Sequence, residues 1–311
     1  MSVLLLGTVL ISCATAFAWF SRVQVRSALR EKESLERRSA AEVLVAAIIT
    51  GIKSNVLVKF DSLLLPWFKP FIAPIDDAAW VIQIRPLDDK IPIRNIFLPD
   101  GSTLRTEMRD MWYDMWEKMN RRDMADLVLD FLDRDTKARS GSNERETHVN
   151  RTVLDMSELL MLEEMTPAVL YGPNSEKAAL TPATATANVQ PALNSGLDVT
   201  AGLTDYCTLW CGSKININVA PVRVMEILPG LNSSIAERIA EARETAPIKN
   251  MSDLRSIPGF PASTARLSGL VGFSSQYFEI RMEILDDNDT GGGFDVIFDK
   301  STGLIVLWEE I

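Results

Sequence analysis

The chain has 311 residues, and its 42 acidic and 32 basic side chains give a formal net charge of −10. This acidic balance argues against non-specific binding to nucleic acid, because a phosphate backbone favours a basic protein face. The single histidine, His148, argues against a His-based catalytic triad and against a zinc enzyme. It lies in the polar run GSNERETHVN, where we expect a solvated loop residue.

The N-terminal stretch predicts one long helix with two different halves. Residues 3–20 (VLLLGTVLISCATAFAWF) carry no charge. At about 1.5 Å per helical residue this run spans about 27 Å, enough to cross a hydrocarbon core. Residues 21–54 then place apolar residues among charges near helical spacing. Three interpretations stay open: a cleaved secretory signal, a signal anchor, or a pilin-type helix whose apolar half lies first in the membrane and later in a filament core.

The stretch after the helix predicts an irregular connection and then a strand pair. Residues 55–77 are rich in aromatic residues and proline, which indicates a packed connection without regular structure. Residues 79–84 and 91–98 alternate as two strands, with a turn at residues 87–90 between them.

From Thr103 the pattern becomes helical. Residues 103–120 carry Met and Trp at three- and four-residue steps, a stripe typical of a packed core. Residues 123–132 predict a second helix, with Asp123 as its N-cap. Short helices, a charge-poor loop and three strands follow. The helical segments are SELLMLEEM, TPAVLYG and SSIAERIAEARET, the loop covers residues 173–200, and the strands cover residues 274–285, 293–299 and 304–309.

The three cysteines are of two kinds. Cys13 lies inside the apolar run, whereas Cys207 and Cys211 lie close together in DYCTLWCGS. The strand-like context of this pair favours a disulfide that closes a small loop in an oxidising compartment. One turn of helix would suit the same spacing and would make the bridge geometrically awkward. No histidine accompanies the pair, so it makes a poor zinc site.

An acidic loop offers hard oxygen ligands. Asp130, Asp133 and Asp135 are followed by Glu144 in the run DFLDRDTKARSGSNERE. Calcium takes six to eight oxygen ligands and tolerates irregular loops, so it suits this run better than magnesium. The spacing is not that of an EF-hand, and an exposed acidic loop without a metal is the alternative. A second acidic turn, at residues 286–289, predicts a hairpin tip.

The segment ILPGLNSSIAERIAEAR resembles helix-hairpin-helix DNA-binding modules, in which glycines at the hairpin present backbone N–H groups to phosphate. Leu231 and Asn232 follow Gly230, so the second glycine is missing. Basic residues are also absent at the hairpin, where Ser233 and Ser234 stand. A helical-hairpin packing module is therefore preferred to a DNA site.

The longest resemblance is to the K-type (GspK) minor pseudopilins of the type II, or general, secretion pathway. It rests on ININVAPVRVMEILPGLNSSIAERIAEARETAPIKNMSDLRSIPGF, which resembles their central segment. The runs VLDFLDRDTKARSGSNERE, MSELLMLEEMTPAVLYGP and LTDYCTLWCGSKININ resemble other landmarks of that family in the same order. The resemblance covers essentially the whole chain and is strongest over residues 128–260.

This resemblance implies an α+β, pilin-like fold: a long N-terminal helix and a small antiparallel sheet with a large inserted helical domain. That domain would contain a helix-hairpin-helix, or SAM-like, module. The expected divisions are residues 1–54 for the helix, 55–101 and 273–311 for the two parts of the pilin-like domain, and 102–272 for the insert, with the hairpin module at about 215–272.

The resemblance also implies a role. The chain would join I- and J-type minor pseudopilins in a tip complex that initiates and caps a periplasmic pseudopilus built of the major pseudopilin, with secreted proteins as possible further partners. It would be a single-pass protein of the bacterial inner membrane with its bulk in the periplasm, and would bind calcium in the helical domain. K-type subunits lack the glutamate found at position five of most mature pilins, and Leu5 stands there if Met1 is the mature start. A leader with a glycine before its cleavage point is not visible, so processing is inferred. Residues expected on the membrane or filament helix are Leu5, Leu6, Val9, Phe17 and Phe20.

The alternatives are a membrane-anchored helix-hairpin-helix protein that binds DNA, as in competence, and a minor pilin of a type IV pilus. We expect a structural, interacting protein and not an enzyme. A membrane-anchored hydrolase would need a buried, mutually placed catalytic pair, which the sequence does not reveal.

Overall fold

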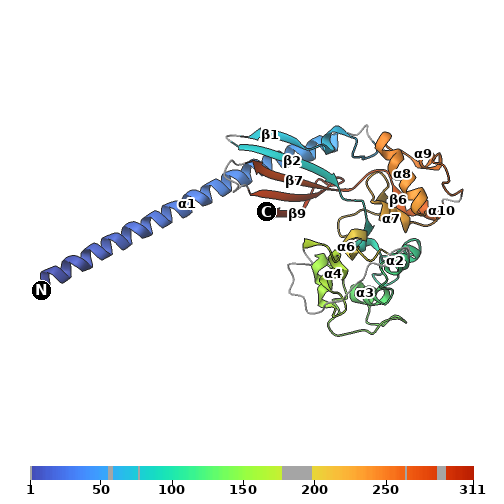
Figure 1. Cartoon of the computed structure of the whole chain (residues 1–311), viewed down its shortest axis with the longest axis horizontal. Helices are drawn as coiled ribbons and strands as arrows, with labels where there is room; N and C mark the ends of the chain where they lie inside the picture. The colour runs from blue at the N-terminus through green and yellow to red at the C-terminus, as the bar shows by residue number, and fades with distance from the viewer. Residues whose placement is uncertain (1, 55–58, 76–77, 177–197, 263–264, 286–291) are drawn as a thin grey trace.

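The computed structural model describes residues 2–54, 59–75, 78–176, 198–262, 265–285 and 292–311, apart from the side chains of residues 2–6, 8, 9, 11, 12 and 78. Figure 1 shows a long helix that projects from a body of two parts, a sheet lying along the end of the helix and a set of short helices beyond it. Two separate hydrophobic cores correspond to these parts.

The projecting element is α1 (Ser2–Ser54), a single helix of 53 residues. At about 1.5 Å per residue it is about 80 Å long. Its buried residues Ala41, Val45, Ile49 and Ile52 recur at helical spacing and form one stripe against the sheet. Only the C-terminal part of α1 is thus anchored, and the predicted long helix is confirmed.

Within the described part of the chain, no helix combines the length and the apolar character that a membrane crossing requires.

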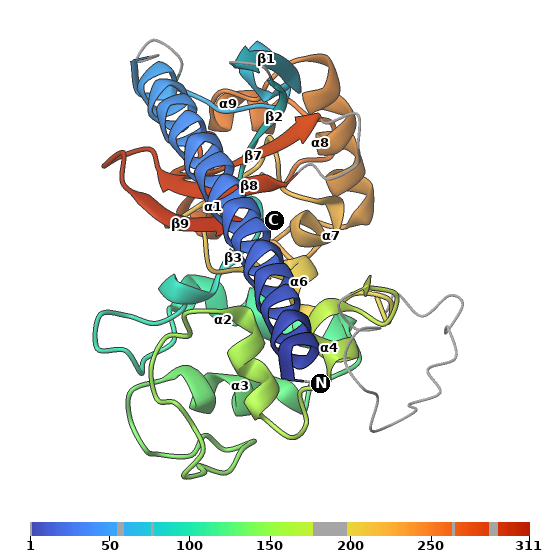
Figure 2. The same cartoon turned by 90° about the vertical axis from the view of Figure 1, so that its left-hand side faces the viewer.

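The sheet is antiparallel throughout, in the order β1-β2-β7-β8-β9. Its strands are β1 (Phe71–Ile75), β2 (Ala78–Pro86), β7 (Tyr277–Leu285), β8 (Gly293–Asp299) and β9 (Ile305–Glu310). Neighbours β2 and β7 come from opposite sides of the insertion, in a register that pairs Trp80 with Ile284 and Ile84 with Ile280. Alternate residues of both strands, including Trp80, Ile82, Phe278 and Ile280, face α1 and form the core between helix and sheet. Figure 2 shows α1 crossing this sheet. The three predicted C-terminal strands are confirmed.

Two predictions for the first half of the sheet are wrong. The stretch expected to be irregular contains β1 and the 3-10 helix η1 (Pro66–Phe68). As a half-exposed edge strand with Pro74 inside it, β1 gives no clear alternation. The strand expected at residues 91–98 is reduced to β3 (Ile91–Pro92), which leaves the sheet and pairs in parallel with β4 (Cys207–Thr208) in the insert. Proline cannot donate to a ladder, and the 3-10 helix η2 (Ile93–Asn95) follows at once.

The insert between β2 and β7 is mainly helical. The predicted stripe lies on α2 (Thr106–Lys118) and is confirmed as part of the core, because its Met and Trp side chains are all buried: Met108, Met111, Trp112, Met115 and Trp116. The remaining elements are α3 (Met124–Leu132), η3 (Met156–Met161), α4 (Pro167–Tyr171), α6 (Leu203–Tyr206), β5 (Ile215–Asn216), α7 (Val222–Glu226), α8 (Ser233–Thr245), α9 (Met251–Arg255), α10 (Ala265–Leu270) and β6 (Val271–Gly272).

The cap predicted at Asp123 is not found, whereas Thr166 forms a cap that was not predicted. Asp123 does not cap α3, because its own backbone is already helical and its side chain pairs with Arg121 at 3.2 Å. Thr166, by contrast, accepts a hydrogen bond from the Val169 N–H at the start of α4.

The packing of α1 on the sheet gives a first prediction. Ile82→Ala removes a fully buried side chain from the helix–sheet core and should lower the free energy of unfolding by about 2–5 kcal/mol. Ile305→Ala on β9, where the side chain is 46% exposed, should cost about 0.5 kcal/mol. Urea unfolding of a chain starting at Arg22 measures both. Equal losses would contradict the position of this core.

Candidate functional site

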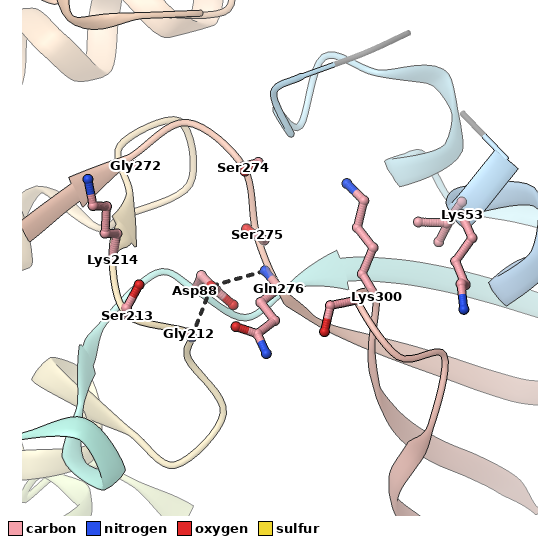
Figure 3. Close-up of a pocket in the computed structure, with 12 residues that line it drawn as sticks. Lys53, Asp88, Gly212, Ser213, Lys214, Gly272, Ser274, Ser275, Gln276 and Lys300 are labelled. Carbon is pink, nitrogen blue, oxygen red and sulfur yellow. Dashed lines mark hydrogen bonds between the residues drawn. The ribbon is translucent and has the colours of Figure 1, made fainter. Parts of the chain in front are cut away.

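The chain leaves the sheet and returns to it at a polar junction centred on Asp88. This residue follows β2 and is 2% exposed. Its carboxylate accepts backbone N–H groups of Gly212, Gln276 and Tyr277, each at 3.0 Å. Figure 3 shows the first two of these hydrogen bonds. One buried carboxylate therefore holds together the exit strand, the re-entry strand and a loop of the insert.

A second buried carboxylate, Asp61, lies in the same junction. It accepts the backbone N–H of Ser275 at 2.8 Å and the Lys300 ammonium at 3.0 Å. The Asn216 side chain donates to the Asp61 carbonyl at 2.9 Å and to the Ser275 hydroxyl at 3.0 Å. The connection before β1, the insert and the sheet are thereby tied to one another.

The Asn-x-Asn-x-Ala-Pro motif, residues 216–221 within the segment ININVAPVRV quoted above, has a physical role. Asn216 makes the junction contacts, and Asn218 exchanges two hydrogen bonds of 2.8 Å with the backbone of Ile248. Both asparagines are buried, so their amide groups replace solvent as partners for backbone groups. Sequence reasoning recognised the motif but missed Asp61 and Asp88, because nothing in the residues next to them reports the distant backbone groups that they contact.

A cavity of about 640 Å³ lies beside the junction, with Lys53, Lys214 and Lys300 among its lining residues (Figure 3). Lys53 donates to the Thr302 carbonyl and Lys214 to the Ser268 carbonyl, both at 2.9 Å. These lysines come from α1, the insert and the β8–β9 turn respectively. They act as further links between the parts of the protein.

The predicted acidic ligands fall into separate groups. The side chains of Asp130 and Asp133 are 0% and 1% exposed, and both contact Arg139. Asp135 is only partly buried and accepts the backbone N–H of Lys137 at 2.8 Å. Glu144 lies 3.4 Å from Nδ1 of His148. Within the described residues, no three His, Cys, Asp or Glu side chains are grouped so that they could hold a metal ion.

The same loop nevertheless contains buried oxygens without a hydrogen-bond donor. They are Oδ1 of Asp130, Oδ1 of Asp133, Oγ of Ser142, both carboxylate oxygens of Glu144 and Oδ1 of Asn150. A buried oxygen without a partner is costly, and hard oxygen atoms are the donors that calcium prefers. Burial also raises the pKa of Asp133 to about 6, while its hydrogen bond from Arg139 lowers it. The donor chemistry fits calcium, although the oxygens are not gathered around one point.

The prediction that His148 is a solvated loop residue is wrong. Its ring packs edge-on against Phe131 with 5.8 Å between ring centroids, and the residue is 7% exposed. The run around it is mostly polar apart from Val149, so no periodic signal reports this tertiary contact.

Cys207 and Cys211 are buried free thiols in the structure. The Cys207 sulfur lies 3.5 Å from the Met115 sulfur, whereas the Cys211 sulfur lies 3.8 Å from the Lys214 carbonyl oxygen. Burial raises the pKa of the Cys211 thiol well above its ordinary value. The disulfide stays a prediction, and it would require both sulfurs to leave these partners.

The hairpin segment folds as two helix pairs, α7–α8 and α9–α10, each with a glycine in the left-handed region at its turn. Gly230 and Gly259 both have φ of +82°. Arg238 donates to the Pro258 carbonyl at 2.8 Å, and Arg243 donates to the carbonyls of Ile217 and Ala220 at 2.7 and 2.6 Å. These guanidinium groups thus serve backbone carbonyls of the module, as expected for a packing role.

The residues expected on the membrane or filament helix lie on the projecting part of α1. Phe17 and Phe20 are 73% and 53% exposed. Leu5, Leu6 and Val9 belong to the helical backbone, but their side chains lie outside the described residues. An exposed apolar surface of this kind marks an interaction site.

The junction gives a prediction on pH. Burial raises the pKa of Asp88 to about 6 from an ordinary value of 3.8, although its three N–H donors lower it. The folded state therefore binds this proton more tightly than the unfolded chain, and the resulting stabilisation is complete below about pH 4 and is lost as the pH rises to about 6. The unfolding free energy of the wild type relative to Asp88→Asn should thus fall by about 3 kcal/mol in all, from well below pH 4 to well above pH 6.

Chemical denaturation at a series of pH values measures that difference. Asp123→Asn removes an exposed carboxylate outside the junction and serves as the control. Parallel pH profiles for wild type and Asp88→Asn would contradict the effect of burial on Asp88.

Comparisons with known proteins agree with this architecture. A family model described as a helix-hairpin-helix motif matches residues 212–270. No curated protein sequence matches the chain. Among solved structures, a chain of the GspK-GspI-GspJ complex from the enterotoxigenic Escherichia coli type 2 secretion system is similar with a TM-score of 0.59 and 14% identity. The match covers 93% of this chain and 99% of that one. It confirms the predicted pilin-like fold, a long helix and an antiparallel sheet with a large helical insert that carries a hairpin module.

Proposed function

We propose that the chain is a K-type minor pseudopilin that assembles with I- and J-type minor pseudopilins at the tip of a type II secretion pseudopilus. The observation that carries this proposal is the correspondence of fold along nearly the whole length of both chains. It includes the insert as well as the helix and sheet. The solved relative is itself part of a complex of three pseudopilins.

The projecting helix supports an assembly role. Its exposed apolar residues include Leu10, Phe17, Trp19, Phe20 and Leu29. The described part of the chain leaves these side chains exposed, and helices of other subunits would bury them by lateral packing. We propose that the major pseudopilin lies below this subunit in the filament, and that α1 resides in the inner membrane before assembly with the body in the periplasm. The role is structural, without catalysis.

We further propose that the acidic loop binds calcium. Asp130, Asp133 and Glu144 would supply carboxylate oxygens, and Ser142 and Asn150 would add neutral oxygens. The support is the set of buried oxygens that have no hydrogen-bond donor. Of the four calcium ligands expected from the sequence, Asp135 has the least support, because its carboxylate already accepts the backbone N–H of Lys137. The ion would neutralise buried charge and hold the loop together.

DNA binding is a second candidate, because residues 212–270 match a helix-hairpin-helix model. The contacts of Arg238 and Arg243 favour the structural role, since both guanidinium groups are engaged with backbone carbonyls. The three glutamates of α8 are exposed and would repel a phosphate backbone: Glu237, Glu241 and Glu244.

Assembly is tested by mixing this chain, from Arg22 onward, with I- and J-type pseudopilins of the same system and measuring the mass by size-exclusion chromatography with light scattering. A 1:1:1 complex is the expected result. Leu29→Glu places a charge on an exposed apolar position of α1 and should weaken the complex at least about tenfold, or about 1.4 kcal/mol.

Glu33→Gln, also exposed on α1, is the matched control and should leave the complex intact. A monomer of this chain, under conditions in which the I- and J-type subunits pair, would refute the tip role.

Calcium is tested by thermal unfolding in chelator and in calcium. A ligand present at about 100 times its dissociation constant stabilises by about 2.7 kcal/mol, which raises the midpoint of a domain of this size by several degrees, roughly 5 °C. Glu144→Gln should abolish this shift, whereas Glu146→Gln, an exposed neighbour, should retain it. A thermal unfolding midpoint that is the same in chelator as in calcium would refute the calcium proposal.

A further inference from the structure

A small apolar pocket lies where the end of α1 meets the edge of the sheet. Its volume is about 270 Å³, and it is lined by three residues of α1 and one each of η1, β1 and β2: Ile48, Gly51, Ile52, Trp67, Phe71 and Ile84. None of these side chains carries a charge. Since β1 is an edge strand and its Phe71 is 40% exposed, the pocket borders solvent.

Gly51 keeps this pocket open. It lies near the end of α1 in ordinary helical structure, where glycine is less favourable than alanine. A Cβ atom added at Gly51 would meet no heavy atom of the described residues within 4 Å, apart from its chain neighbours and the nearby helix backbone. No close packing inside the described chain therefore requires a glycine here, and its missing side chain leaves space for a group from outside.

The pocket has the size and the lining for one large apolar side chain. A cavity of about 150 Å³ holds a benzene ring, whereas pockets for small-molecule ligands begin at about 300 Å³. The apolar lining offers a charged group no hydrogen-bond partner and favours the burial of an aliphatic or aromatic group. A side chain of the size of leucine, methionine or phenylalanine therefore fits.

The place of the pocket on α1 indicates where such a group comes from. Gly51 follows Phe20 by 31 residues, or about 47 Å of helix. One leaflet of a hydrocarbon core is about 15 Å thick, so the acyl chains of a bilayer around residues 3–20 do not reach the pocket. A neighbouring protein does reach it when it packs along α1, because Leu44 and Ile48 are partly buried and precede Gly51 on the same side of the helix.

We propose that the pocket receives one large apolar side chain of a neighbouring I- or J-type minor pseudopilin, inserted between α1 and β1. The inference rests on the tip assembly proposed above and adds the point at which the folded body of this chain holds a partner. An apolar side chain that fills a desolvated pocket is typical of the few residues that dominate the binding energy of an interface.

Gly51→Leu should change stability and assembly in opposite directions. Leucine favours the helix more than glycine does, and the added side chain has free space, so the melting temperature of the chain alone should rise by about 2 °C or more. The same side chain occupies the pocket, so the affinity for the partners should fall at least about tenfold. Gly51→Ala should show the same two signs with a smaller loss of affinity. Damage to the fold would instead lower both quantities.

The matched control is Thr50→Leu. Thr50 is the exposed neighbour of Gly51 on α1, and it does not line the pocket. The change adds the same apolar side chain to the same turn of the helix. Under the proposal its affinity for the partners stays within about threefold of the wild type, as for a surface substitution outside the contact.

The experiment uses the full chains of the three subunits in lipid nanodiscs, because free detergent also enters apolar pockets. The affinity is measured by titrating labelled chain with its partners. A photo-crosslinking analogue of phenylalanine at Phe71 then identifies the group in the pocket by mass spectrometry. Weaker assembly of Gly51→Leu together with a cross-link to an apolar side chain of an I- or J-type partner supports the proposal.

The other outcomes overturn it in distinguishable ways. Equal assembly of the wild type and Gly51→Leu overturns the inserted side chain while the tip role stands. A cross-link to lipid or to a second copy of this chain overturns the choice of occupant. A lower melting temperature for both Gly51 variants overturns the open space at Gly51. Absence of assembly by the wild type overturns the tip role and the pocket proposal together.

Discussion

The pairing of β2 with β7 is the constraint on which the rest of the molecule depends. The whole insert lies between these strands, and its two ends must return to within one strand spacing of each other, about 4.8 Å. The buried carboxylates of Asp88 and Asp61 fix these ends through backbone N–H groups on the returning chain. The entropy cost of closing a loop grows only slowly with its length. A large insertion is therefore tolerated once these hydrogen bonds hold its two ends together.

Elements with a strong local period were predictable from the sequence. In α2 and β7 the order of apolar residues matches the pattern of buried positions, as a Met and Trp stripe in α2 and as alternation in β7. The length of α1 was predictable because no proline interrupts its helical pattern. Strands at the sheet margin were not predictable in the same way. The residues around β1 carry no pattern that predicts its pairing with β2. The pattern at Ile91–Pro92 predicts a strand of the main sheet, but this segment pairs with a strand of the insert. The partner of a short strand is decided by tertiary packing, which is why propensity fails there.

The residues of the candidate sites likewise divide into those visible in the local sequence and those brought together only by folding. The acidic run around Asp130 was visible because its carboxylates are close in sequence, but Arg139 and the burial of His148 against Phe131 depend on folding. Asp61 and Asp88 accept hydrogen bonds from residues that lie far along the chain, at Ser275 and Gln276. A buried charge with distant partners leaves no motif. The Asn-x-Asn-x-Ala-Pro run was the one visible sign of the junction, and its chemistry became clear only with the contacts of Asn216.

The single anchored end of α1 also has a mechanical consequence. A continuous helix behaves as a stiff rod over its length, and the stripe from Ala41 to Ile52 is its attachment to the sheet. An axial pull on the free end loads this stripe in shear, so that four buried side chains and the Lys53–Thr302 hydrogen bond resist it at the same time. A sideways push instead acts through a long lever arm and concentrates torque where the helix first meets the sheet, near Ala41. The subunit is therefore stiff along the direction of its helix and compliant across it.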